Sequence, residues 1–264
     1  MISRNFSLSG RTALVTGAAG YLGSMIATAL AEAGAHVLVN SRSAERSEKL
    51  VAELREVGLS AESAVFDVAD EAAVRDFFEA RGNIAINILV NNAYVGAAGS
   101  VASATPENYR QSYEISVVAA HNLFVAALPA MRRGVAEHGD AAVINIASMY
   151  AMVSPDQRIY DAAISANPPF YGAAKAALLQ WTRYAACEFG PEKIRFNSVS
   201  PGPFPSAAVQ VRDPAFVQRL VNKVPLGRVG QQAEIGGPVV FLASPAASFV
   251  NGANLVVDGG WTCW

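Results

Sequence analysis

Seven short runs of apolar and β-branched residues recur along the chain, and longer segments separate them. Most of the runs are continuously apolar rather than alternating, which is typical of strands buried on both faces of a parallel sheet. The predicted strands are Thr12–Thr16, His36–Asn40, Ala64–Phe66, Ile86–Asn91, Ala142–Ala147, Ile194–Val199 and Leu255–Val257.

Apolar residues between these runs recur at helical spacing. Leu22, Ile26 and Leu30 lie four residues apart and precede Gly34, a residue type that commonly ends a helix. Residues 105–107 (Thr-Pro-Glu) supply an N-cap, a proline at the first helical position and an acidic first turn. The other helices are predicted over residues 44–57, 71–81, 106–133, 170–189 and 232–243.

Strands and helices therefore alternate from one end of the chain to the other, without an internal repeat, a low-complexity tract or a linker. This order predicts an α/β fold, a Rossmann-like doubly wound parallel sheet of about seven strands with helices on both faces. Because 52% of the 264 residues are hydrophobic and only 16% are charged, the chain can bury one large core. We expect residues 1–264 to form a single domain.

Charge and targeting signals exclude several classes of function. The net charge is −2 without any block of like charge, so we expect no nucleic acid and no anionic membrane as partner. Residues 1–10 lack the apolar run of a signal peptide, and polar residues and a proline interrupt the apolar stretch 115–131. Cys187 and Cys263 have no metal or redox spacing, and the three histidines are scattered. We expect a cytoplasmic protein without a metal site.

A glycine-rich turn follows the first predicted strand and opens the first helix. Glycine allows the backbone to turn tightly and to approach a pyrophosphate, which the N–H groups at the start of a helix can bind. An ordinary strand-to-helix turn is the alternative interpretation. The predicted dinucleotide contacts in this turn are Gly17, Ala19, Gly20, Tyr21, Leu22 and Gly23.

The end of the second strand indicates which dinucleotide binds. An acidic residue there would bind the ribose hydroxyls of NAD, whereas the chain has Ser41 and Arg42. A guanidinium suits the extra phosphate of NADP, so NADP(H) is the preferred cofactor and NAD(H) remains possible. A solvated arginine before a helix is the alternative. Asp67 and Val68, after the third strand, are predicted to contact the adenine or simply to start a helix.

Tyr171 and Lys175 are four residues apart in a predicted helix, so their side chains share one face. A nearby ammonium favours the anion of a tyrosine and lowers its pKa from about 10 toward neutral pH. Such a tyrosine can transfer a proton while a nicotinamide carries a hydride. Without other motifs, the pair could equally be a helix face with no catalytic role.

Several further motifs give the chain a resemblance to the short-chain dehydrogenase/reductase family over essentially its whole length. They are residues 16–23, Asp67-Val68, Asn91-Asn92-Ala93, Ser148, the Tyr171/Lys175 pair, Pro201-Gly202 and residues 257–260. The resemblance implies that Ser148 hydrogen-bonds the substrate oxygen and that Lys175 also holds the nicotinamide ribose. It further implies that Asn92 and Ala93 line the cofactor, that Pro201 and Gly202 lie at the carboxamide, and that four copies assemble into a homotetramer.

The chain departs from the family pattern at four places. Tyr21 stands where the single-domain members usually have glycine, and Gly20 replaces a basic residue that often helps to hold the NADP phosphate. Ser116 aligns with the asparagine that commonly completes the catalytic set, so we expect activity with a weaker or rearranged proton path. Tyr94 replaces a glycine, and its ring either narrows the substrate cleft or covers the end of the sheet.

The fourth departure is the spacing of Ser148 and Tyr171, which are separated by 22 residues, about ten more than the family usually has. This insertion (residues 150–169) is predicted to form part of the substrate wall, with Arg158 or Tyr160 binding polar substrate groups. Packing or subunit contact is the alternative. A substrate-covering segment, called the cover below, is expected over residues 203–226 and begins near Phe204.

Three functions are compatible with these residues. The leading one is hydride transfer between a secondary alcohol and a ketone, on a sugar acid or other polyhydroxylated small molecule, as in family members acting on gluconate. The second is a reductase of 3-oxoacyl or hydrophobic ketones, for which the apolar stretch 204–224 is the support. The third is an NADPH-binding sensor or structural subunit with little turnover, to which only Ser116 points.

Overall fold

Seven parallel strands form one sheet in the computed structural model, which describes residues 2–264. The strand order is β3-β2-β1-β4-β5-β6-β7, so the predicted fold class and all seven predicted strands are confirmed, with ends that differ by a few residues. The strands are β1 Thr12–Val15, β2 His36–Ser41, β3 Ala61–Val65, β4 Ile88–Asn91, β5 Ala141–Ile146, β6 Ile194–Pro201 and β7 Asn254–Val257.

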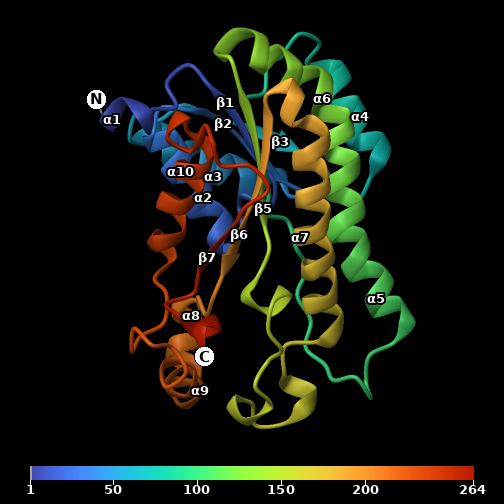
Figure 1. The fold of residues 1–264 in the computed structure, drawn as a ribbon, viewed down its shortest axis with the longest axis vertical. Coiled ribbons are helices and arrows are strands. Elements are labelled where there is room, and N and C mark those ends of the chain that lie inside the picture. Colours follow the sequence, from blue (N-terminus) through green and yellow to red (C-terminus); the bar gives the residue numbers. More distant parts are fainter. Residues whose placement is uncertain (1) are drawn as a thin grey trace.

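Helices cover both faces of this sheet (Figure 1). On one face lie α2 Tyr21–Glu32, α3 Ala44–Glu56 and α10 Gly236–Ala243; on the other lie α4 Glu71–Ala80, α5 Pro106–Tyr113, α6 Ala119–His138 and α7 Pro169–Phe189. Three short helices complete the chain: α1 Ile2–Asn5, α8 Ala207–Arg212 and α9 Pro214–Val221.

Two apolar cores, one on each face, explain why the strands are continuously apolar. Ala13 and Val15 belong to the core beneath α2, α3 and α10, whereas Leu14 between them belongs to the core beneath α4, α6 and α7. Burying one leucine side chain of this kind contributes about 2 kcal/mol relative to exposure. The doubly covered sheet is therefore a direct consequence of the strand pattern.

The long helix predicted over 106–133 begins as expected but is not uniform. Thr105 caps α5, with Pro106 at the first position and Glu107 in the first turn. A π-helical turn, Glu114–Val118, then separates α5 from α6, which extends to His138. The combined helix is long and apolar enough to cross a membrane, but half of its most apolar window is buried against the sheet and its neighbours, so it is a core helix.

A cluster of charged residues lies at the amino-terminal edge of the sheet. Arg11 contacts Asp140 at 2.6 Å, and Arg195 contacts the other oxygen of the same carboxylate at 3.4 Å. Arg195 also donates a hydrogen bond of 2.9 Å to the carbonyl of Leu242 in α10. Both arginines are buried, and the one carboxylate that they share offsets part of their combined charge.

The strand order reverses between β1 and β4. β1 pairs with β2 on one side and with β4 on the other, so the connections that leave these strands at their carboxyl ends diverge. Ligands of doubly wound proteins bind in the crevice that this divergence creates.

Candidate active site

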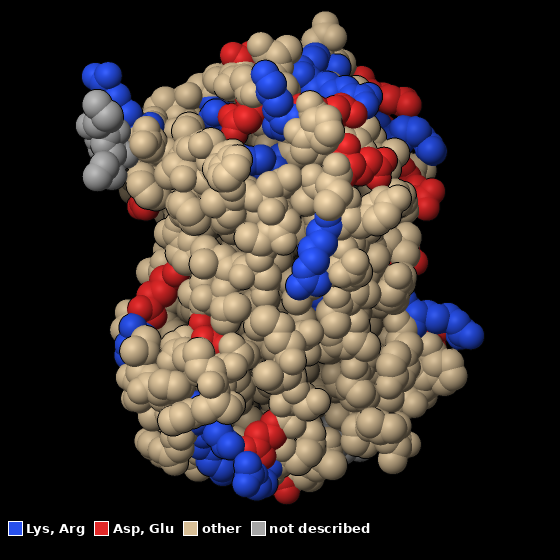
Figure 2. All heavy atoms as spheres, viewed as in Figure 1, with Lys and Arg blue, Asp and Glu red and all other residues tan. Residues whose placement is uncertain are grey.

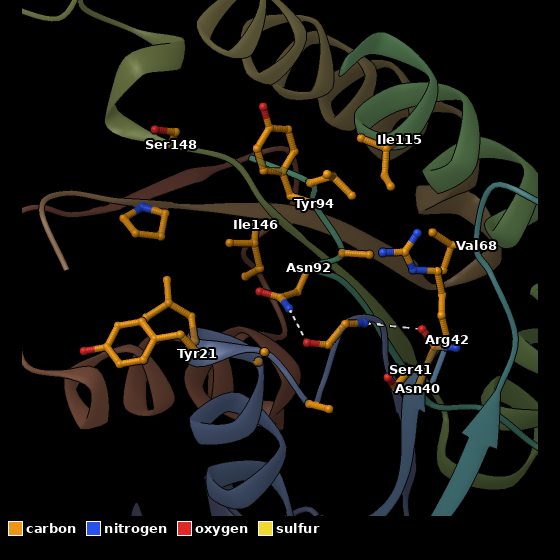
Figure 3. Close-up of a pocket in the computed structure, with 18 of the residues that line it drawn as sticks. Tyr21, Asn40, Ser41, Arg42, Val68, Asn92, Tyr94, Ile115, Ile146 and Ser148 are labelled. Carbon is orange, nitrogen blue, oxygen red and sulfur yellow. Dashed lines mark hydrogen bonds between the residues drawn. The ribbon is translucent and has the colours of Figure 1, made fainter. Parts of the chain in front are cut away.

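The glycine-rich turn after β1 is braced by side chains from two neighbouring strands (Figure 3). Asn92 donates hydrogen bonds to the carbonyls of Thr16 (2.9 Å) and Gly17 (3.2 Å), and the Gly17 amide donates to Asn40 (3.3 Å). Gly17 has a φ of +59°, and a Cβ at Gly23 would collide with the carbonyl oxygen of Gly17. Both positions therefore require glycine.

The start of α2 is suited to an anion. No side chain caps the helix at Gly20, and its first turn carries no acidic residue. The N–H groups of this turn and the helix dipole face the crevice, where they can bind a pyrophosphate.

A group of polar and basic residues lies at the end of β2. Ser41 and Arg42 are placed as predicted, and Arg42 also lies 3.7 Å from Asp67. Arg46, which the sequence analysis missed, lines the same crevice from the first turn of α3, and the Ser43 side chain accepts a hydrogen bond from its backbone amide. The signal available in the sequence was a second arginine in the first turn of the helix predicted over 44–57, close behind Arg42.

One pocket of about 590 Å³ extends from these arginines to the catalytic candidates. Its wall contains every predicted cofactor contact and three of the four predicted catalytic residues. The predicted residues in the wall are Gly17, Ala19, Gly20, Tyr21, Leu22, Gly23, Ser41, Arg42, Asp67, Val68, Asn92, Ala93, Tyr94, Ser148, Tyr171, Lys175, Pro201, Gly202 and Phe204.

Lys175 and Tyr171 project from α7 into this pocket. The Lys175 ammonium donates a 2.7 Å hydrogen bond to the Ile146 carbonyl, and burial lowers the pKa of Lys175 to about 8. Burial raises the pKa of Tyr171, and the hydroxyl of Ser148 opposes this shift. The protein's own groups thus do not lower the pKa of Tyr171, so the lowering expected from sequence would need the positive ring of an oxidised nicotinamide.

Tyr94 lies at the same end of the pocket, and its ring points toward α5 and α7 (Figure 3). Its ring contacts Tyr171 edge-on at 4.7 Å between centroids, and the Lys175 ammonium is 5.3 Å from its centre. Burial raises the pKa of Tyr94 to about 12. The ring is therefore a neutral aromatic part of the pocket wall beside the catalytic candidates.

Ser116 lies outside the main pocket, in the π-helical turn. It is buried, and within the part of the chain that the structure describes its hydroxyl oxygen has no hydrogen-bond partner. It lines a separate cavity of about 10 Å³ that Lys175 also lines. A volume of this size fits about one water molecule.

Arg158 and Tyr160 are not brought to the pocket wall, in contrast to the prediction for the insertion. The Arg158 side chain is 83% exposed and forms a bidentate ion pair with Asp156, at 2.8 Å for both hydrogen bonds. The Tyr160 hydroxyl contacts that of Tyr150 at 3.1 Å, and its ring packs against Phe216 in α9. Local partners hold both side chains away from the pocket.

Comparison with known proteins identifies the family. A family model described as enoyl-(acyl carrier protein) reductase matches residues 17–262. The chain belongs to the short-chain dehydrogenase/reductase family. This short-chain dehydrogenase is therefore an oxidoreductase of CH–OH groups with an NAD(P) cofactor.

Relatives of this dehydrogenase act on different substrates. It is 35% identical to gluconate 5-dehydrogenase of Gluconobacter oxydans, covering 97% of this chain and 96% of the relative. It is 32% identical to the rhamnolipid-biosynthesis 3-oxoacyl-[acyl-carrier-protein] reductase of Pseudomonas aeruginosa, covering 97% and 98%. A solved gluconate 5-dehydrogenase from Burkholderia cenocepacia, in complex with NADP and tartrate, superimposes with a TM-score of 0.88 at 34% identity and full coverage of both chains.

The residues present fit a dinucleotide. The glycine turn leaves the helix amides of α2 accessible, and the pocket continues without interruption from Arg42 and Arg46 to Tyr171. In this short-chain dehydrogenase the arginines would hold the adenosine end, and Lys175 and Asn92 would hold the nicotinamide end.

Proposed function

We propose that this dehydrogenase interconverts a secondary alcohol and a ketone on a sugar acid or another polyhydroxylated small molecule, with NADP(H) as the preferred cofactor. One observation carries the proposal. Ser148, Tyr171 and Lys175 converge at one end of a pocket whose other end contains two arginines and two serines.

In the proposed mechanism a bound dinucleotide supplies or accepts the hydride. The Ser148 hydroxyl donates a hydrogen bond to the substrate oxygen and stabilises the charge that develops there. Tyr171 gives its proton to that oxygen during reduction and removes it during oxidation. The carbonyl of Ile146 holds the Lys175 ammonium at 5.9 Å from the centre of the phenol ring, where its protonated form favours the tyrosinate.

NADP(H) is favoured by the basic end of the pocket. Arg42 and Arg46 provide two guanidinium groups, and Ser41 and Ser43 provide hydroxyl groups. Asp67 lies close to Arg42 and offsets part of its positive charge. Arg46 therefore supplies the further positive charge that binds the phosphate on the ribose of NADP. The NADP complex of the Burkholderia relative supports the same preference.

The substrate class rests on the sugar-acid relatives. Gluconobacter and Burkholderia gluconate 5-dehydrogenases both cover nearly the whole chain. A second candidate, reduction of a 3-oxoacyl or hydrophobic ketone, is favoured by one observation: Tyr94, Val95 and Phe204 make part of the pocket wall apolar. The Pseudomonas relative acts on such a substrate class.

The test is a substrate panel followed at 340 nm with both NADP⁺ and NAD⁺. The panel contains sugar acids, polyols and hydrophobic alcohols, and the variant Tyr171→Phe is assayed beside the wild type. We expect turnover of a sugar acid or polyol, with kcat reduced at least about 10²-fold in the variant because it has lost the proton donor.

The variant should still bind the dinucleotide, as measured by equilibrium dialysis, because only its hydroxyl is missing. Turnover of hydrophobic alcohols alone would favour the second candidate. Undiminished turnover in Tyr171→Phe would contradict the mechanism. Tight binding of NADPH by the wild type, without turnover of any compound in the panel, would instead favour the sensor hypothesis.

A further inference from the structure

The insertion lies at one end of the molecule, beside α8 and α9 (Figure 1). None of the residues 150–169 that the structure describes lines the main pocket. Figure 2 shows basic and acidic side chains together at this end, whereas the middle of the same face carries few charges. The contacts of these charges indicate what the insertion does.

An apolar cluster first joins the insertion to two distant parts of the chain. Ile159 of the insertion is buried with Leu220 and Val224 of the cover and with Trp261 near β7. Met149, which directly follows Ser148, belongs to the same cluster. The cover is thus packed onto the insertion, and the insertion is packed beside the turn that carries Ser148.

Polar contacts then connect the insertion to α9 and the residues just after it. Asp156 forms an ion pair with Lys223, and Arg219 donates hydrogen bonds to the Ile159 carbonyl (2.7 Å) and to Asp161 (2.9 Å). Arg158 and Lys223 hold the pKa of Asp156 well below its usual range, so the carboxylate stays charged at any ordinary assay pH. All three contacts involve the last turn of α9 and the residues just after it, so they restrict the movement of this end of α9 relative to the insertion.

The cover in turn reaches the pocket. Phe204 at its start lines the pocket wall, and the backbone amide of Tyr150 donates to the Ser148 hydroxyl at 3.1 Å. The insertion therefore touches both the catalytic serine's turn and the segment that faces the substrate, although it does not reach the substrate space itself.

We propose that the insertion positions the cover over the catalytic end of the pocket, and that Asp156, through Lys223, is the positioning residue that fastens it. The function of the cover rests on the proposed dehydrogenase activity, but the attachment itself does not. The insertion then affects substrate affinity through the cover and without contacting the substrate. The sequence had instead predicted that the insertion forms part of the substrate wall.

The first test is hydrogen exchange of the full-length protein, read by mass spectrometry on peptides that span residues 204–226. Asp156→Asn keeps an oxygen acceptor for the Arg158 amide and removes only the charge. We expect exchange in α9 to rise about two- to fivefold, the equilibrium change typical of one partly exposed ion pair. Lys223→Met should give the same increase.

Arg158→Gln is the matched control, because Arg158 binds the same carboxylate but is mostly exposed and pairs within the insertion. Its exchange in α9 should equal that of the wild type. Unchanged exchange in Asp156→Asn, or an equal increase in Arg158→Gln, would overturn the proposal.

The second test is kinetic and uses whichever alcohol the panel identifies. Asp156→Asn should raise KM for that alcohol about two- to fivefold and leave KM for the dinucleotide unchanged, because Arg42 and Arg46 lie at the far end of the pocket. A rise in both constants would contradict the positioning role. If no alcohol turns over, the proposed function fails, whereas the exchange measurement still decides the attachment.

Discussion

At the scale of single residues, the basic end of the pocket shows how one side chain can alter the function of another. Arg42 alone would be an incomplete phosphate site, because Asp67 lies 3.7 Å from its guanidinium and draws part of its charge. Arg46, one turn further along, has no such carboxylate within ion-pair distance among the described residues. The preference for NADP(H) therefore depends on both arginines.

Arg46→Ala should raise KM for NADP⁺ about tenfold and leave KM for NAD⁺ nearly unchanged, because only NADP⁺ carries the phosphate that the guanidinium would bind. Initial rates with each dinucleotide measure both constants. Lys49→Ala is the control, since Lys49 is a 77%-exposed cation on the same helix. Equal changes for the two dinucleotides would show that Arg46 does not read the phosphate.

At the scale of elements, the π-helical turn between α5 and α6 contributes to two cavities, since Ile115 lines the main pocket whereas Ser116 lies outside it. A π turn adds one residue to the helix and rotates the side chains that follow it. Here it directs Ser116 into the small cavity that Lys175 also lines. One water there would connect the serine hydroxyl with the ammonium, which is the proton path we propose for this chain.

Ser116→Ala tests that path. We expect kcat to fall about tenfold, with a shifted pH–rate profile, because the bridging water loses a partner. The melting temperature should hold or rise slightly, because a buried hydroxyl without a protein partner has been removed. If neither Ser116→Ala nor Ser116→Asn changes the pH–rate profile, the serine has no part in proton transfer.

The elements also show which parts of the fold could be predicted from the sequence. The inner strands were predicted because burial on both faces requires a continuous apolar run. The prediction for β3 began three residues too late, because Glu62 and Ser63 interrupt the apolar pattern. The dinucleotide turn was predicted because glycine positions are a local requirement. The π turn, α8 and α9 were not predicted, although local signals for the two helices were present: Ser206 caps α8, and Asp213 caps α9. Arg158 was placed wrongly for a different reason: its neighbour Asp156, two residues earlier, binds the guanidinium and holds it away from the pocket.

At the scale of the whole molecule, the buried ammonium of Lys175 links stability to pH. Its pKa in the folded state is about 8, below the ordinary value of 10.5, because burial disfavours the charge. Between these values the unfolded chain binds more protons than the folded one. The free energy of unfolding therefore rises with pH across this interval, by at most about 3 kcal/mol from this group.

Urea unfolding at pH 7.5, 8.5 and 9.5 measures this contribution, with Lys175→Met as the comparison. The free energy of unfolding of the wild type should increase relative to that of the variant over this range. The range stops below pH 10 because burial raises the pKa of Tyr171 and Tyr94, which has the opposite effect on stability above it. Parallel pH profiles for the two proteins would contradict the buried, titrating lysine.

The charged cluster of Arg11, Asp140 and Arg195, at the amino-terminal ends of the strands, constrains the order in which this chain can accept mutations. Asp140 is shared by two buried guanidinium groups, at 2.6 Å and 3.4 Å. Replacing it first would leave two buried cations without a counter-charge, at a cost of several kcal/mol, which is a large fraction of the stability of a typical domain. Mutational paths that discard the cluster must therefore neutralise Arg11 or Arg195 before they reach Asp140, so the order of substitutions, and not only their identity, is under selection.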